Sequence, residues 1–230
     1  MATISDNIQQ VRARIAAACA VAQRPVQSVT LLAVSKTVGA TVVRDAWSAG
    51  QRAFGENYVQ EAIDKMDTMA DLRASTEWHL IGPLQSNKTR VVAERFDWVH
   101  SVDRLKVAER LAQQRPAHLA PLQVCLQVNI SDEASKSGLA PDDVLPVARD
   151  VAALPRLRLR GLMAIPEPVG DVDAQRRPHA ALHALLRRLQ EAGLAVDTLS
   201  MGMTADLEAA VAEGATIVRV GTAIFGARAA

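Results

Sequence analysis

The sequence predicts an α/β fold in which eight parallel strands, with helices between them, close into one (β/α)8 barrel of the TIM type, with an extra helix at the N-terminus. Two observations carry this prediction. Short runs rich in β-branched residues alternate along the chain with longer amphipathic segments, and parallel strands need such crossover helices. Most of the eight strand candidates follow one another at about 20–25 residues, a spacing that suits a closed barrel.

The chain opens with a predicted amphipathic helix. Apolar residues recur at helical spacing from Ile4 to Ala22, and Ser5 or Asp6 stands near its start. The two arginines ahead of the apolar run 15–22 superficially resemble the beginning of a secretory signal. The run is short, however, and its residues continue the helical stripe. We therefore expect a helix of the fold rather than a signal peptide.

The remaining elements alternate strictly between strand and helix. Strands are predicted at 29–34, 52–54, 78–81, 98–100, 122–129, 157–163, 198–201 and 216–220. Helical patterns lie between them, including those at 40–49, 56–69, 103–115, 141–153, 174–191 and 204–212. No linker or repeat divides the chain, so we expect a single domain over residues 1–230. An open doubly wound sheet is the rival fold, but no glycine-rich fingerprint follows the first strand, which weakens a dinucleotide-binding interpretation.

Composition excludes several classes of protein. The 230 residues include 26 basic and 25 acidic side chains, a formal net charge of +1, so no strong electrostatic attraction to nucleic acid or to an anionic membrane is expected. Three Trp, three Phe and one Tyr are too few for base-stacking platforms, and no apolar run approaches the roughly 20 residues of a membrane span. Cys19 and Cys125 are too few and too far apart for a disulfide framework or a zinc site. We expect a cytoplasmic protein with reduced thiols and no metal.

In a (β/α)8 barrel, functional residues gather where strands end and the following loops begin. Lys36 stands at such a position, directly after an apolar strand, where burial would favour the neutral, nucleophilic amine. It is one of only five lysines beside 21 arginines, and the other four fall in helical or loop patterns. Lys36 is therefore a candidate for Schiff-base formation; a strand-end lysine that reaches water is the alternative.

The seventh and eighth strands end in residues suited to an anion. Barrels commonly place a phosphate at these two loops, against a helix N-terminus. Gly202 and Gly221 let backbone N–H groups approach an anion, and Ser200 and Thr222 add hydroxyl donors. Ordinary helix capping is the alternative explanation of each cluster.

Arg219 lies inside the last apolar strand, where an inward-pointing charge needs a partner. Together, Lys36, the anion cradle and Arg219 match the requirements of pyridoxal phosphate (PLP). This cofactor needs an amine for its aldehyde, donors for its phosphate and a partner for its pyridine nitrogen. An arginine that bridges to a carboxylate is the competing explanation.

Several long motifs of the chain resemble those of the pyridoxal phosphate homeostasis proteins (the PROSC/YggS family). The resemblance runs along nearly the whole chain and rests on Leu32-Ala33-Val34-Ser35-Lys36, Phe54-Gly55-Glu56-Asn57-Tyr58, Trp78-His79-Leu80-Ile81-Gly82-Pro83-Leu84-Gln85, Leu199-Ser200-Met201-Gly202-Met203 and Val218-Arg219-Val220-Gly221-Thr222-Ala223-Ile224-Phe225-Gly226. The likeness implies the barrel of the alanine racemase N-terminal domain standing alone.

The resemblance also implies roles for individual residues. Lys36 matches the lysine that forms the internal aldimine with PLP. Ser200, Gly221 and Thr222 match phosphate-binding positions, and Arg219 matches the residue that faces the pyridine nitrogen. Asn57 matches a position packed near the cofactor, and His79 and Met201 are expected neighbours. The family is regarded as regulating free PLP and passing it to apo-enzymes, so PLP-dependent apo-enzymes are the expected partners.

An arginine at the ring nitrogen favours a carrier over a catalyst. A protonated guanidinium leaves the pyridine nitrogen unprotonated and the cofactor a poorer electron sink. A racemase would then need a second base beside Lys36, and Tyr58 is the only tyrosine. In the alanine racemase pattern that base comes from an additional domain of a partner subunit, so we expect a monomer without a dedicated reaction.

Two enzyme alternatives stay open. One is a PLP-dependent amino-acid racemase of low activity. The other is a Schiff-base aldolase that uses Lys36 without a cofactor. Glu56, which follows a predicted strand, is then the carboxylate of its acid–base relay. His179 and His183 lie four apart on a predicted helix, and we expect them on its solvated face. Lys136, in a polar loop, is a lesser candidate for transient contact with PLP.

Overall fold

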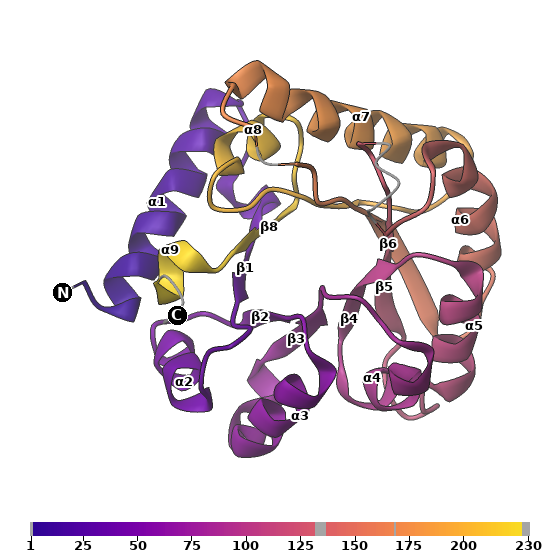
Figure 1. Ribbon diagram of the computed structural model, residues 1–230, viewed down its shortest axis with the longest axis horizontal. Coiled ribbons are helices and arrows are strands. Elements are labelled where there is room, and N and C mark those ends of the chain that lie inside the picture. The colour runs from indigo at the N-terminus through magenta and orange to yellow at the C-terminus, as the bar shows by residue number, and fades with distance from the viewer. Residues whose placement is uncertain (1, 132–136, 168, 227–230) are drawn as a thin grey trace.

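The computed structural model describes residues 2–131, 137–167 and 169–226. Eight parallel strands hydrogen-bond in sequence order and close into a barrel, which confirms the predicted fold class (Figure 1). The strands are β1 (Thr30–Val34), β2 (Ala53–Glu56), β3 (Glu77–Leu80), β4 (Trp98–Val102), β5 (Leu122–Gln127), β6 (Leu157–Met163), β7 (Thr198–Ser200) and β8 (Ile217–Val220). Closure is made by β1 against β8, with Leu32 opposite Arg219.

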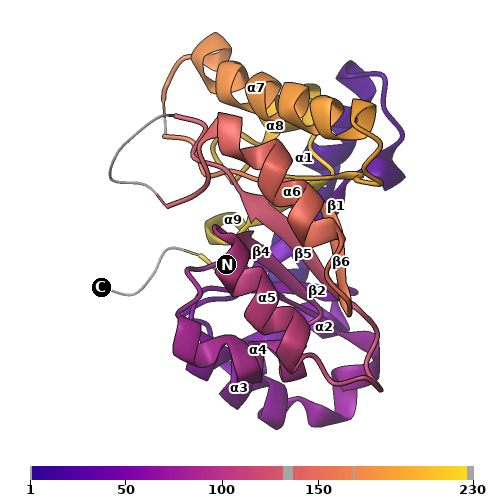
Figure 2. The same ribbon diagram turned by 90° about the vertical axis from the view of Figure 1, so that its right-hand side faces the viewer.

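Helices surround the barrel and connect its strands (Figures 1 and 2). They are α1 (Ile4–Val21), α2 (Ala40–Ser48), α3 (Val59–Thr68), α4 (Thr89–Arg95), α5 (Leu105–Gln114), α6 (Val144–Ala152), α7 (Val172–Glu191), α8 (Leu207–Ala212) and α9 (Thr222–Phe225). Short 3-10 helices lie at Val26–Ser28, Ala70–Ser75, Ser86–Lys88 and Pro141–Asp143. None of the helices in the described ranges is long and apolar enough to span a membrane.

Side chains along each strand alternate between the barrel interior and the layer beneath the helices. The interior holds a small apolar cluster: Leu32, Val34, Ala53, Ile81, Trp98, Cys125, Met163 and Ile217. The neighbouring strand residues join a much larger cluster that packs the barrel against the helices. Since successive strand side chains point to opposite faces, the same alternation also turns polar side chains inward, among them the mutually contacting His79, His100, Ser200 and Arg219.

The N-terminal helix α1 lies outside the barrel and packs against α8 and α9. Thr3 caps it in a capping box with Asp6, whose backbone N–H donates to the Thr3 hydroxyl while its carboxylate accepts from the Thr3 N–H. Its apolar stripe, which includes Ile8 and Ile15, is buried. The expected helix at this end of the chain is thus confirmed.

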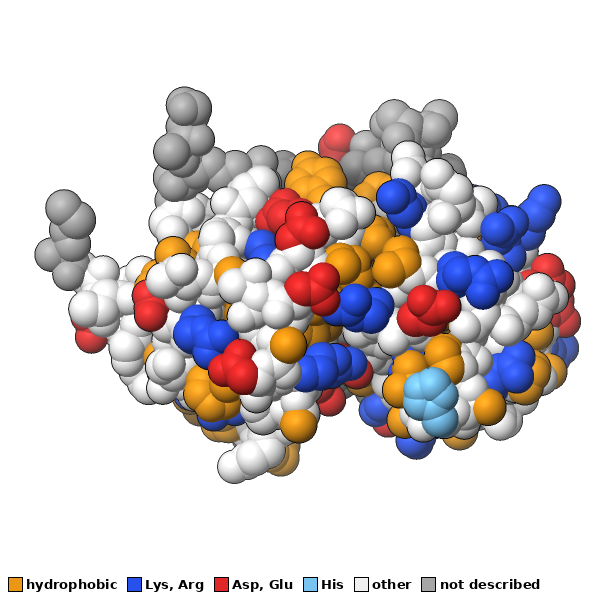
Figure 3. Space-filling view, turned by 90° about the horizontal axis from the view of Figure 1, so that it is seen from below, with side chains coloured by type: hydrophobic (Ala, Val, Ile, Leu, Met, Phe, Trp, Pro, Cys, Tyr) orange, Lys and Arg blue, Asp and Glu red, His pale blue; other side chains and the backbone are white. Residues whose placement is uncertain are grey.

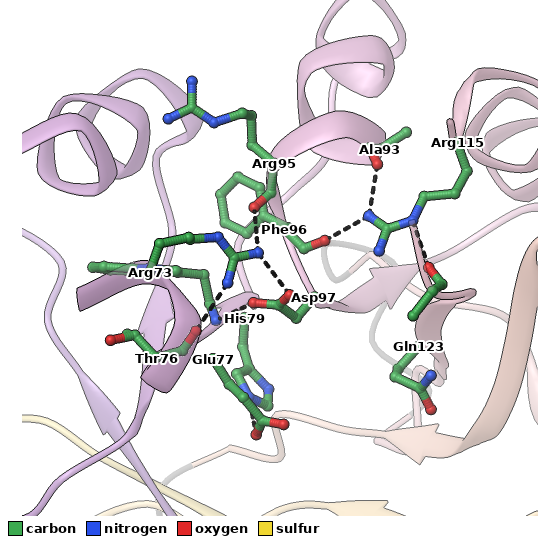
Figure 4. Close-up of polar contacts among 12 residues, drawn as sticks. Arg73, Thr76, Glu77, His79, Ala93, Arg95, Phe96, Asp97, Arg115 and Gln123 are labelled. Atoms are coloured by element: carbon green, nitrogen blue, oxygen red, sulfur yellow. Dashed lines mark hydrogen bonds and ion pairs between the residues drawn. The ribbon is translucent and has the colours of Figure 1, made fainter. Parts of the chain in front are cut away.

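The amino end of the barrel is held by charged side chains (Figure 4). Arg73 donates to Asp97 at 2.7 Å, and the other Asp97 oxygen accepts the N–H of Trp78. Arg115 donates to the carbonyl oxygens of Ala93 and Phe96. These bonds satisfy backbone groups where strands start, far from the edge that carries Lys36.

The structure corrects several predicted boundaries. The helix predicted from residue 56 begins at Val59, because Glu56 still belongs to β2. The helix predicted from residue 204 begins at Leu207. The prediction also missed α4, whose seven residues are too few for a clear helical period.

Acidic and basic side chains are interspersed over the face seen from below Figure 1, and no large area of one sign appears there (Figure 3). This pattern agrees with the formal net charge of +1. On this face the molecule offers no continuous basic surface of the kind that holds a nucleic-acid backbone.

Candidate cofactor-binding site

Lys36 lies two residues beyond β1, at the carboxyl edge of the barrel. Its loop turns sharply: the Val38 N–H donates to the Ser35 carbonyl oxygen at 3.0 Å, and Thr37 adopts a φ of 64°, a left-handed conformation that is unfavourable for threonine. Lys36 is half-buried and lines a cavity of about 300 Å³, here called the Lys36 cavity. Gly221 and Thr222 line the same cavity.

The wall formed by Gly221 and Thr222 offers hydrogen-bond donors. Gly221 is the N-cap of α9 and supplies no side chain to cap it, and the first N–H groups of a helix have no partner within the helix. A Cβ atom on Gly221 would lie 3.2 Å from the Val34 carbonyl oxygen, so glycine allows the ends of β8 and β1 to approach closely. The cavity therefore combines an amine with the type of backbone wall that receives anions.

Arg219 is buried beneath the rim, with 4% of its surface exposed. Its Nη1 donates to the Ser200 carbonyl oxygen at 2.5 Å and to the Ser200 hydroxyl at 2.9 Å, and its Nη2 donates to the Ala164 carbonyl oxygen at 2.8 Å. Among the described residues it forms no ion pair with a carboxylate. The sequence-based alternative of an arginine bridged to a carboxylate is therefore wrong within that part of the chain.

A chain of polar contacts continues from Arg219 through the barrel. The Ser200 Oγ lies 2.7 Å from His100 Nδ1, and His100 Nε2 lies 3.0 Å from His79 Nδ1. His79 Nε2 in turn lies 3.7 Å from the Glu77 carboxylate at the amino end of the barrel (Figure 4). When the Ser200 hydroxyl donates to His100 and His100 donates to His79, each of these two hydrogen bonds joins one donor to one acceptor.

Burial affects the protonation of two of these side chains, His100 and Arg219. Burial, reinforced by the neighbouring His79 and Arg219, holds the pKa of His100 well below 6.5, so His100 is neutral. Burial also lowers the pKa of Arg219 to about 10, which still leaves it protonated at neutral pH. Among the described residues, the Arg219 guanidinium is a buried cation that is hydrogen-bonded only to uncharged oxygens.

Asn57 occupies the loop after β2 and lines a neighbouring cavity of about 280 Å³ at the same edge of the barrel. Its Oδ1 is buried and has no hydrogen-bond partner among the residues that the structure describes. The loop after β3 packs directly on it, since a Cβ atom on Gly82 would lie 2.3 Å from the Asn57 carbonyl oxygen. Asn57 is thus held at the rim beside the Lys36 cavity rather than within its walls.

The other predicted site residues lie elsewhere. Ser200 and His79 take part in the interior chain, and neither lines the Lys36 cavity. Met201 is fully buried in the layer between barrel and helices. The structure thus brings Lys36, Gly221 and Thr222 together directly and places Arg219 beneath them. The phosphate role of Ser200 stays a prediction.

The loop after β7 is fixed by Asp206. Its carboxylate accepts the Met203 N–H at 2.6 Å and contacts His179 Nε2 at 2.9 Å. Although burial alone would raise the pKa of Asp206, the hydrogen bonds from His179 and Met203 lower it. The expectation that His179 lies on a solvated face is therefore wrong: His179 is buried, because it packs α7 against this loop. His183 is half-buried and contacts the Glu213 carbonyl oxygen.

Glu56 does not line the Lys36 cavity. It is fully buried outside the barrel, where it pairs with Lys65 at 2.8 Å. Lys65, expected in a helical pattern open to solvent, is only 5% exposed. The helical spacing that places Glu61 four residues before Lys65 was the available signal, but only the packing of α3 on β2 shows that these charges are buried. Burial raises the pKa of Glu56, against the opposing effect of Lys65.

His100 is the site residue that the sequence analysis missed. It follows Trp98 by two positions in a strand, so the alternation of β4 was the signal that it points inward. Lys136, the lesser candidate, lies outside the described residues. Among the described residues no cluster of three or more His, Cys, Asp or Glu is suited to a metal ion. Burial raises the pKa of Cys125 to about 12, which keeps this thiol protonated.

The chain is similar to known proteins along nearly its whole length. The family model of the alanine racemase N-terminal domain matches residues 3–229. Relatives named pyridoxal phosphate homeostasis protein include one from Pseudomonas aeruginosa, 60% identical over 228 residues (99% of this chain and 97% of the relative), and one from Escherichia coli K12, 53% identical over 233 residues (99% and 98%).

Solved structures agree in fold. PipY of Synechococcus elongatus PCC7942 with PLP bound is 38% identical, with a TM-score of 0.85 over 97% of this chain and 100% of PipY. Alanine racemase from Corynebacterium glutamicum, at 17% identity and a TM-score of 0.70 over 89% of this chain and 58% of the racemase, shares the fold alone. The resemblance read from the motifs is thus confirmed: the chain belongs to the alanine racemase N-terminal domain family and, within it, to the pyridoxal phosphate homeostasis proteins.

Proposed function

We propose that this chain binds PLP in the Lys36 cavity, holds it as a Schiff base on Lys36 and releases it to apo-enzymes. The observation that carries the proposal is that Lys36 and the uncapped start of α9 line one cavity. An aldehyde and a phosphate on one small molecule need an amine and a set of anion donors within reach of each other. The PLP present in PipY supports the same cofactor here.

The residues around the cavity fit PLP. Backbone N–H groups at Gly221 and Thr222, with the Thr222 hydroxyl, would hold the phosphate. Arg219, buried and without a carboxylate partner among the described residues, would donate to the pyridine nitrogen. The buried Asn57 Oδ1, which lines the neighbouring cavity, accepts no hydrogen bond from any described residue. Each of these groups has hydrogen-bonding capacity that a bound cofactor satisfies.

PLP supplies an aldehyde carbon to which an amine adds reversibly. The Lys36 nitrogen forms a carbon–nitrogen double bond with that carbon, and the carbonyl oxygen leaves as water. Water reverses the step without any oxidant or reductant. The chain's own contribution is to present the Lys36 amine from a fixed turn and to hold the phosphate, so that the captured aldehyde is shielded yet recoverable.

The described structure supports a carrier more than either enzyme. A racemase needs a second base at the substrate carbon, but Tyr58 is 56% exposed and lines neither rim cavity. A cofactor-independent aldolase needs an acid–base group beside Lys36, but Glu56 is paired with Lys65 outside the barrel. Both alternatives would have to use groups other than those the sequence suggested.

Three further features belong to the proposal. The carrier acts as a monomer, which light scattering tests by giving the mass of one chain. Its recipients are PLP-dependent apo-enzymes, tested by the rate at which the loaded protein activates such an enzyme compared with free PLP at equal concentration. It works in the cytoplasm, where Cys19 and Cys125, both free and buried, would stay reduced.

The first experiment is to incubate the protein with PLP, record its absorbance, reduce it with borohydride and map the labelled peptide. We expect a visible band and a label on Lys36. The Lys36→Ala variant loses both, because it lacks the amine that forms the bond. Lys106→Ala, which changes a surface lysine on α5, keeps both. A colourless wild-type protein, or a label on another lysine, contradicts the proposal.

A further inference from the structure

The loop that carries Lys36 is held from behind by three charged residues, Glu56, Glu61 and Lys65, here called the Lys65 cluster. The Lys65 ammonium donates to the Glu56 carboxylate at 2.8 Å and to the Glu61 carboxylate at 2.5 Å. Its third bond goes to the Ser35 carbonyl oxygen at 2.5 Å. All three ammonium hydrogens are thus used, and Lys65 itself has none left for other chemistry.

Ser35 and Thr37, the two neighbours of Lys36 in the sequence, are both bonded to this cluster. The Ser35 hydroxyl donates to Glu56 Oε1 at 2.6 Å, in addition to the bond from Lys65 to the Ser35 carbonyl. On the other side, the Thr37 N–H donates to Glu61 Oε1 at 2.6 Å. Ser35, Glu56 and Lys65 are all buried, so water competes poorly for the bonds among these three residues, whereas the bond from Thr37 to Glu61 is exposed.

The bond to Glu61 matters because Thr37 is strained. Its φ of 64° lies in the left-handed region, which costs a residue with a Cβ about as much free energy as one hydrogen bond supplies. The bond to Glu61 opposes a return of Thr37 to negative φ, which would turn the Lys36 backbone as well. Among the described residues the Thr37 hydroxyl bonds to the adjacent Lys36 carbonyl oxygen, which does not fix φ from outside the loop.

We infer that the Lys65 cluster is a positioning device for the PLP lysine: it keeps Thr37 left-handed and thereby directs Lys36 into its cavity, so that it controls the rate of PLP capture. The inference rests on the function proposed above. It concerns residues that do not line the Lys36 cavity. The cluster acts on the loop through Ser35 and Thr37.

The test is a cycle of variants in which PLP capture by the folded protein is followed by stopped-flow absorbance. Glu61 is partly exposed, so Glu61→Ala should fold, and thermal unfolding verifies this. We expect capture to slow roughly 5- to 30-fold, the factor that corresponds to the cost of a left-handed residue. Asp67→Ala, which removes an exposed carboxylate of the same helix that pairs with Arg95 and not with the loop, should not change the rate.

The Thr37→Gly variant distinguishes an effect on the position of Lys36 from a general loss of stability. Glycine adopts positive φ without strain, so Glu61→Ala should slow capture much less in a Thr37→Gly background than in the wild-type background. Lys65→Met, provided that it folds, should show the same dependence on the background. An equal effect of Glu61→Ala in both backgrounds, or no effect in either, overturns the inference while the wild-type protein still labels at Lys36. Failure of the wild-type protein to label overturns the proposed function instead.

Discussion

At the scale of single residues, the interior of the barrel shows how strand alternation creates an unusual electrostatic site. Arg219 has its positive charge in an apolar interior, yet its contacts are two carbonyl oxygens and the Ser200 hydroxyl. The neutral His100 keeps the hydroxyl oriented without adding a second charge. Such an arrangement preserves a donor for a ligand above it, whereas a carboxylate partner would neutralise it.

His100 makes stability depend on pH. Its folded pKa lies well below 6.5, whereas in the unfolded chain it returns to about that value. Below pH 6.5 the unfolded state therefore binds the extra proton, and stability falls as pH falls. We expect the wild-type protein to lose about 1 kcal/mol more than His100→Asn between pH 6.5 and 5.5. Urea unfolding at both pH values measures this difference.

His118 provides the control for that measurement, because it lies on the surface. His118→Asn removes an exposed histidine by the same substitution and is the matched comparison. A His100→Asn protein whose stability changes with pH as steeply as that of the wild-type protein would show that His100 is not held neutral.

At the scale of elements, the site is built by loops that pack on each other at the carboxyl edge. The loop after β3 touches the loop after β2 through Gly82, whose N–H and whose neighbour Ile81 bond to the Glu56 carbonyl oxygen. The Ser101 hydroxyl, from β4, donates to the Gly82 carbonyl oxygen at 2.6 Å. Three successive strands thus fix the position of Asn57.

Gly82→Ala tests this packing. Its Cβ would lie 2.3 Å from the Asn57 carbonyl oxygen, so the two loops must separate. We expect a loss of about 1–3 kcal/mol in the free energy of unfolding, as for other overpacked sites, together with weaker PLP binding. Gly170→Ala, at a position with open space around it, should change stability by less than about 0.5 kcal/mol. Equal stabilities of the two variants would contradict the close approach.

At the scale of the whole molecule, the two ends of the described chain meet beside the Lys36 cavity. Asn7 on α1 donates to the Ile224 carbonyl oxygen on α9 at 2.8 Å, across 217 residues of sequence (Figure 1). Arg14 on the same helix pairs with Glu208 on α8. The extra helix therefore supports the two short helices that follow β7 and β8.

Asn7→Ala is expected to lower the free energy of unfolding by about 1 kcal/mol, the usual contribution of one hydrogen bond. Because the lost bond holds α9, PLP affinity should fall as well. Urea unfolding and PLP titration measure the two effects, and Gln10→Ala, on the exposed side of α1, is the control. An unchanged affinity in Asn7→Ala would show that α1 does not support the cavity.

Much of the fold could be predicted from the sequence because each element has a strong local signal. The strand predicted at 157–163 agrees with β6 at both ends, and the helix predicted at 40–49 differs from α2 by one residue. Lys36, Gly221 and Thr222 were predictable because they directly follow strands. Ser200 shows the limit: its position at a strand end was evident, but its bonds to Arg219 and His100 depend on strands far away in sequence.

The alternation of strands and helices, the strand-end lysine and the family motifs can all be recognised without a structure, since period, composition and local order are properties of neighbouring residues. Which charges are buried, and which groups contact one another, became evident from the folded arrangement. Closure of the barrel joins His79, His100, Ser200 and Arg219 across its interior, and the packing of α3 on β2 buries Lys65 between two carboxylates. Burial and long-range contact depend on how distant segments pack, and that information is not local to any segment.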